Sequence, residues 1–159
     1  MNIDLKDSLL RFFVPASIFF SISYWFSDNF QTSVESINIF ILTVHFVAFG
    51  FFIGALGTVL QIGIEWMFSS PWRKDPLQYW EIVGSNSYIQ NKIEKTWSFY
   101  TLNLYSLVAA ILTLIYCASI SISTTEKLVI ILVSCLFLYL TIFNFRKITN
   151  IAKELLAEE

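Results

Sequence analysis

Four long stretches of this 159-residue chain contain no charged side chain, and they limit its possible folds more than any other feature. A helix that crosses the hydrocarbon core of a bilayer needs about 20 mostly apolar residues, with roughly 17 to 25 observed. The second and third stretches exceed this length, the fourth just reaches it, and the first needs its apolar flanks. The sequence therefore predicts four transmembrane helices, at about residues 12–30, 37–64, 97–122 and 128–145.

The composition agrees with a membrane protein. Apolar residues make up 56% of the chain and charged residues 14%, against roughly 25% charged in an ordinary soluble domain. Five Gly and three Pro exclude low-complexity classes, two Cys cannot form a disulfide framework, and a net charge of −2 argues against direct nucleic-acid binding. We expect one all-α domain, a polytopic membrane protein over residues 1–159 with the lipid bilayer as its first partner.

Lys and Arg fall almost entirely on one side of the predicted helices. Nine of the ten lie in the N-terminal segment, in the loop 65–96 or in the tail 146–159, and Lys127 is the tenth. The positive-inside rule places these segments in the cytoplasm, so the chain is expected to be N-in and C-in in the inner (plasma) membrane. The same segments carry acidic residues, which argues against dedicated capture of anionic lipids or RNA.

Proline and glycine divide the cytoplasmic loop into short elements. Ser69, Ser70 and Pro71 are expected to end the second helix. Asp75 followed by Pro76 is an N-cap pattern, and Gly84 predicts the end of a short helix over 77–83.

The third predicted helix is longer than a bilayer requires. From Tyr88 onwards apolar residues recur at three- and four-residue spacing, and nothing interrupts them before Ile122. A continuous helix of about 35 residues would be roughly 52 Å long, against a hydrocarbon core of about 30 Å. The third helix is therefore expected to extend into the cytoplasm.

Aromatic and aliphatic residues near the cytoplasmic side are candidates for contact with a partner. Trp66, Trp72 and Trp97 are also explained by an aromatic belt at the membrane interface. The tail carries a narrow apolar seam that fits either a solvated helical extension or a protein contact. The candidate contact residues for a cytoplasmic protein partner are Trp72, Trp80, Tyr88, Ile151 and Leu155.

A face of small residues runs along the second predicted helix. Gly50 and Gly54 form a GxxxG pattern, and Gly57 and Thr58 continue it. Small residues let helix backbones approach closely in lipid. Packing within the chain is favoured over association between subunits, and a homo-oligomer remains the second interpretation.

Few polar residues lie at membrane depth. His45 is the one ionisable residue deep in a predicted span, and such groups are functional candidates. It has no intramembrane acid to pair with, so a neutral histidine bonded to a neighbouring helix is the preferred interpretation. Gln61, Glu65 and Asn103 form a candidate polar cluster at the cytoplasmic mouth for an ion or ligand.

Three further polar or sulfur-containing residues are assigned structural roles. Asn144, like Asn103, is expected to bond between helices. Cys117 and Cys135 lie at similar depths in antiparallel helices and are interpreted as two small buried hydrophobes.

No motif for catalysis is present. The sequence has no hydrolase nucleophile motif, zincin motif, phosphate loop or metal-ligand spacing. It also lacks a repeated arginine pattern, a selectivity filter and an inverted repeat. We therefore expect no enzyme, no catalytic residue, no metal and no cofactor.

The architecture over residues 12–145 resembles that of the four-helix membrane subunit of the Kiwa anti-phage defence system. It is also similar to the immunity proteins against pore-forming colicins. The first resemblance implies a membrane protein that works with a separate cytoplasmic effector, and no residue roles are carried over from either family.

Three functions follow as hypotheses. The first is a non-enzymatic oligomeric scaffold or sensor that recruits a cytoplasmic effector, in bacterial anti-phage defence. The second is an ion channel or membrane-perturbing pore gated by a hydrophobic constriction. The third is immunity against a pore-forming bacteriocin through helix contacts at Gly50 and Gly54.

Overall fold

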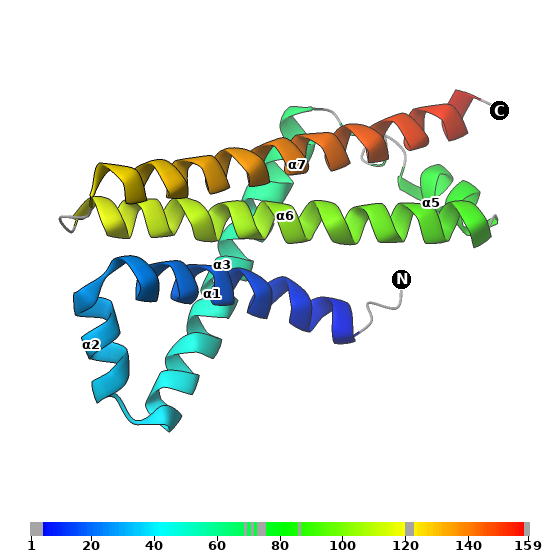
Figure 1. Ribbon diagram of the computed structural model, residues 1–159. Coiled ribbons are helices and arrows are strands. Elements are labelled where there is room, and N and C mark those ends of the chain that lie inside the picture. The colour runs from blue at the N-terminus through cyan, green and yellow to red at the C-terminus, as the bar shows by residue number, and fades with distance from the viewer. Residues whose placement is uncertain are drawn as a thin grey trace.

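The computed structural model describes residues 5–68, 70, 72, 76–85, 87–119 and 123–157, and all secondary structure in these ranges is helical (Figure 1). For residues 5–11, 76–78, 80, 82 and 155–157 only the backbone is described. The predictions for Ser69, Pro71, Asp75 and the side chains of Trp80 and Leu155 lie outside the described part.

The first predicted span is interrupted at Ser27. Helix α1 covers Leu5–Phe26 and helix α2 covers Asp28–Ser36. Ser27 adopts an extended backbone, with φ −137° and ψ 105°, and its Oγ accepts a hydrogen bond from the Phe30 N–H at 3.1 Å. A serine N-cap followed by an acid in the first turn starts a new helix here. The predicted continuation of the first span to residue 30 as one helix is therefore wrong.

Helix α3 covers Ile39–Met67 and agrees with the second predicted span. The Asn38 side chain caps its start by accepting from the Phe40 N–H at 2.8 Å. In Figure 1 α3 crosses α1 and the long α6 described next, and it packs against both.

Helices α6 (Ser87–Ser119) and α7 (Thr124–Ala157) form a long side-by-side pair (Figure 1). The predicted uninterrupted third helix is confirmed as far as Ser119, and residues 120–122 lie outside the described part. At the start of α7, Ser123 and Glu126 form a capping box: the Ser123 N–H donates to Glu126 Oε2 and the Glu126 N–H donates to Ser123 Oγ. The predicted fourth span and the predicted tail belong to this one helix.

Three described helices are long and apolar enough to cross a membrane, namely α3, α6 and α7. The apolar part of α1, Phe12–Phe26, is shorter. The all-helical membrane class is thus supported with three candidate spans, while the fourth span and the N-in, C-in orientation stay predictions.

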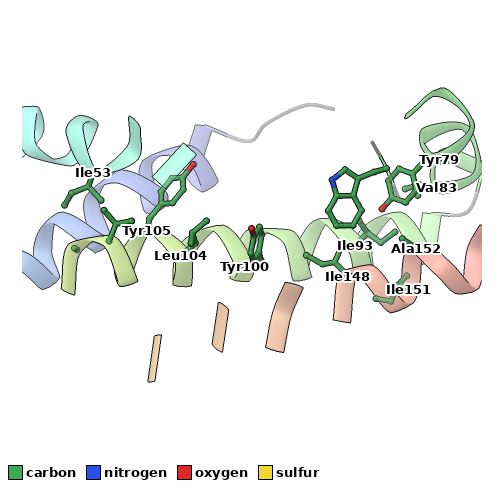
Figure 2. Packing of buried hydrophobic residues seen from close by; sticks show 13 residues of the cluster. Ile53, Tyr79, Val83, Ile93, Tyr100, Leu104, Tyr105, Ile148, Ile151 and Ala152 are labelled. Atoms are coloured by element: carbon green, nitrogen blue, oxygen red, sulfur yellow. The ribbon is translucent and has the colours of Figure 1, made fainter. Parts of the chain in front are cut away.

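Helix α5 (Pro76–Ser85) begins at the proline that the sequence pattern assigned to the first helical position. Figure 1 shows α5 beside the start of α6 and the end of α7. We call α5, residues 87–96 of α6 and residues 146–157 of α7 the distal head. Figure 2 shows Tyr79, Val83, Ile93, Ile148, Ile151 and Ala152 of its core at the right. Trp72, which precedes α5, belongs to the same buried cluster, and we count it as part of the distal head.

Candidate functional site

The small-residue face of α3 packs against α1 and α6 of the same chain. A Cβ atom at Gly54 would collide with the Phe12 ring, and one at Gly57 would collide with the Tyr105 ring. At Gly50 it would lie 3.1 Å from the Phe12 carbonyl oxygen. The missing side chains therefore permit close helix contact within the chain, as the sequence favoured.

Thr58 extends this face with a hydrogen bond to α6. Its Oγ1 donates to the Gly54 carbonyl oxygen at 2.8 Å and lies 2.9 Å from the Tyr105 Oη. Because Thr58 has given its single hydrogen to Gly54, Tyr105 is the donor in the second bond. Figure 2 shows Tyr105 and Ile53 together at the α3–α6 contact.

The most organised polar group in the described chain surrounds Glu65, near the end of α3. Glu65 is 6% exposed, and each carboxylate oxygen accepts a hydrogen bond. Gln61 Nε2 donates to Oε1 at 2.8 Å, and Trp72 Nε1 donates to Oε2 at 3.4 Å. Ser70 donates to the Glu65 carbonyl oxygen through both its N–H and its Oγ, each at 3.2 Å. We call these four residues the Glu65 centre; it joins α3 to the core of the distal head.

Asn103 does not belong to this group. Its Nδ2 donates to the Phe99 carbonyl oxygen of its own helix at 2.8 Å, and Asn144 donates to Leu140 in the same way at 2.9 Å. Neither amide has a hydrogen bond to another helix within the described residues, so the predicted interhelical bonds are wrong for that part of the chain. A carbonyl four residues earlier is the nearest acceptor for a short polar side chain in an apolar helix.

His45 behaves in the same way. Its Nδ1 lies 2.8 Å from the Ile41 carbonyl oxygen, one turn earlier in α3, and the ring is exposed. The predicted bond to a neighbouring helix is wrong for the described residues. Cys117 is buried as expected, whereas Cys135 is exposed, and both are free.

The candidate partner-contact residues divide into internal and external positions. Trp72 and Ile151 are 6% and 9% exposed and pack inside the distal head. Trp72 contacts the Trp97 ring edge to face, at 5.3 Å between centroids. Tyr88 is 73% exposed at the start of α6. Of the predicted contact residues with described side chains, Tyr88 alone faces outwards.

Two tyrosines near the distal head were not singled out from the sequence. Tyr100, labelled in Figure 2, is fully buried. Its ring packs against Trp97 and Phe145, and its Oη has no hydrogen-bond partner among the described residues. Burial raises the pKa of Tyr79, in the distal head, to about 12. Both tyrosines occur at a helical apolar spacing, which predicts that their rings lie in a core. The spacing does not indicate which hydroxyl groups become buried.

These features define an all-helical protein with three helices of membrane-spanning length and apolarity and a folded distal head at one end. Within the described residues no group of three or more His, Cys, Asp or Glu could hold a metal ion. Comparison with protein-family models, with curated proteins and with solved structures finds no match.

Proposed function

We propose that this chain is a non-enzymatic, multi-pass protein of the inner (plasma) membrane that presents the distal head in the cytoplasm to a soluble effector protein. It would act as an oligomeric scaffold or sensor. The observation that carries the proposal is the packed core of the head, which fixes a surface beyond the apolar parts of α6 and α7.

The lengths of the two long helices support this placement. α6 has 33 residues and α7 has 34, or about 50 Å each at about 1.5 Å per residue. A hydrocarbon core of about 30 Å leaves about 20 Å of each helix outside. The parts of α6 and α7 that belong to the distal head carry charged residues, as expected of helix ends outside a bilayer. They are Lys92, Glu94, Lys95, Arg146 and Lys147.

The surface of the head suits a protein partner better than a polyanion. Acidic and basic residues are interspersed on it, so it offers no uniform basic patch for RNA or anionic lipid. Tyr88 places a largely exposed aromatic ring among these charges. Aromatic residues within a polar rim are the common energetic centres of protein interfaces. We propose Tyr88 as the centre of the contact.

Site-specific photo-crosslinking in cells tests the proposal. A photoreactive residue at Tyr88 should give a discrete crosslink to a soluble protein. The same residue at Tyr139, which is 63% exposed on the apolar part of α7, is the matched control and should give none. Equal crosslinking patterns at the two positions, or no crosslink at Tyr88 in a folded protein, would count against docking at the head.

The orientation of the chain in the membrane is tested by a separate measurement. In a background without Cys117 and Cys135, Ser85→Cys should react with a membrane-impermeant maleimide only after the membranes are everted. Ser123→Cys, at the opposite end of α6 and α7, should react in intact cells. The reverse pattern would place the head outside the cytoplasm and overturn the proposal.

The other hypotheses stay predictions. The resemblance to an anti-phage membrane subunit adds a defence role, for which reduced survival of phage-challenged cells after Tyr88→Ala is the expected result. A channel predicts conductance that changes with Gln61 or Glu65. The immunity hypothesis cannot be tested simply by bulky residues at Gly50 or Gly54, because these would first collide with Phe12 or its backbone within the chain.

A further inference from the structure

An open cleft of about 240 Å³, lined mainly by apolar side chains, lies between α1, α2 and α3. Figure 1 shows these three helices meeting at the end of the molecule opposite the distal head. Most of the wall of the cleft is aromatic or aliphatic, contributed by Phe20, Tyr24 and Trp25 of α1, Phe30 and Val34 of α2, and Leu42 of α3.

One lining residue of the cleft is hydrogen-bonded to an acidic side chain, Glu35 of α2. Tyr24, which lines the cleft, donates from its Oη to Glu35 Oε1 at 3.0 Å. Gln31 Nε2 donates to the same oxygen at 3.1 Å. The second oxygen, Oε2, receives no hydrogen bond from the described residues. Two donors thus hold an exposed carboxylate beside the cleft and leave one oxygen for a ligand.

The surrounding charge favours a cation beside Glu35. No Lys or Arg occurs between Arg11 and Arg73, whereas α2 carries both Asp28 and Glu35. An anionic group beside Tyr24 would meet the like charge of Glu35, with no basic residue nearby in sequence. A cationic group would gain a charge-assisted hydrogen bond to Glu35 Oε2.

The position of the cleft indicates an acyl chain for its apolar part. α3 is a candidate membrane span, and α2 turns two apolar residues, Phe30 and Val34, towards the cleft while most of its other residues are polar. This pattern is typical of a helix at the membrane interface. Water in such a cleft would face mainly apolar walls, so a lipid chain is the favoured occupant.

We propose that the cleft binds a phospholipid with a primary ammonium headgroup, that is, a phosphatidylethanolamine. One acyl chain lies among Phe20, Phe30 and Leu42, and the ammonium donates to Glu35 Oε2. A choline headgroup has no N–H to donate, and a glycerol headgroup leaves the lipid anionic. This site is independent of docking at the distal head.

Native mass spectrometry of the detergent-purified full chain tests headgroup selection. The probe is an equal mixture of phosphatidylethanolamine, phosphatidylcholine and phosphatidylglycerol with identical acyl chains. We expect the protein to retain phosphatidylethanolamine about two- to fivefold over phosphatidylcholine, the range of a partly exposed ion pair. Glu35→Gln should abolish this preference, while Asp28→Asn, at the other end of α2, should largely keep it. Unchanged preference in Glu35→Gln would overturn the proposal.

A second variant tests the cleft itself. Val34→Trp should fill it and lower retention of all three lipids. Val129→Trp, at an exposed position of α7, is the matched control and should not. Lipid retention equal to the parent protein in a folded Val34→Trp would contradict the proposal. A change of oligomeric state in that variant, without a change in lipid retention, would show a second copy of the chain as the occupant instead.

Discussion

The hydroxyl oxygens of Thr58 and Tyr105 lie 2.9 Å apart where α3 crosses α6, one residue beyond the position at which Gly57 contacts the Tyr105 ring. The glycine allows the approach of the two helices and the threonine supplies an acceptor. A polar bond and a close contact therefore fix the same crossing point between two apolar helices.

Removing this hydrogen bond should weaken the crossing without abolishing the fold. We expect Tyr105→Phe to lower the free energy of unfolding in mixed micelles by about 0.6 kcal/mol, with about 1.7 kcal/mol as the upper limit for such bonds. A double-mutant cycle with Thr58→Val should show coupling of the same size. Tyr139→Phe, on the exposed side of α7, is the control and should leave the free energy unchanged.

Adding one methyl group to α3 should change the free energy of unfolding differently at Gly57 and at Gly63. Gly57→Ala forces the Tyr105 ring to move, so we expect a loss of about 1–3 kcal/mol in the free energy of unfolding. Gly63→Ala has no atom within 4 Å of the new Cβ and should be neutral or stabilising by up to about 1 kcal/mol. Equal effects of the two variants in the same titration would show that α3 does not pack in this register.

The Glu65 centre should contribute more to the free energy of unfolding than the exposed Gln90–Glu94 pair of α6 does. Glu65→Leu leaves the partly buried amide of Gln61 and the buried indole N–H of Trp72 without their acceptor. We expect a loss of about 1–3 kcal/mol in the free energy of unfolding. Gln90 donates to Glu94 at 3.0 Å with the same four-residue spacing on an exposed surface. Glu94→Leu should therefore change the free energy of unfolding by about 0.5 kcal/mol or less.

A second variant tests the same centre through the free energy of unfolding. Trp72→Phe keeps an aromatic ring but removes the indole N–H, so it should reproduce part of the loss in the free energy of unfolding caused by Glu65→Leu. The two changes should be less than additive, because both remove the bond to Glu65 Oε2. Full additivity would show that the two side chains do not interact.

Shortening a buried side chain of α7 in the distal head should lower the free energy of unfolding more than shortening an exposed side chain of α7 does. Ile148 is fully buried on α7 between residues of α5 and α6, so Ile148→Ala should lower the free energy of unfolding by about 2–4 kcal/mol. Leu132 is largely exposed on α7, and Leu132→Ala should cost about 0.5 kcal/mol or less. Thermal unfolding of both variants in one detergent provides the comparison.

Local signals in the chain predicted much of the helical framework. The absence of helix breakers from Tyr88 onwards gave the continuous α6, and Pro76 marked the start of α5. At Ser27 the relevant signal was present but was outweighed by the apolar residues around it. A serine followed by an aspartate is also a helix start, and this local alternative divides the predicted first span into α1 and α2.

The polar residues show why side-chain partners were harder to predict. The sequence placed Gln61 and Glu65 one turn apart, and that spacing sufficed for their bond. It also offered Asn103 and His45 an acceptor in their own helices, which both of them use. Spacing alone cannot say whether a more distant helix comes close enough to compete with such a carbonyl.

The sequence by itself determined that the chain is helical, apolar enough for a bilayer and longer than a bilayer in α6. These properties depend on the charge, length and breakers of each segment separately. The tertiary structure decided that Phe12 and Tyr105 cover the glycines of α3, that Ile148 and Ile151 belong to the core of the distal head, and that α2 borders a cleft. Each of these depends on which segments approach one another, because a side chain is buried only by atoms that another part of the chain brings to it.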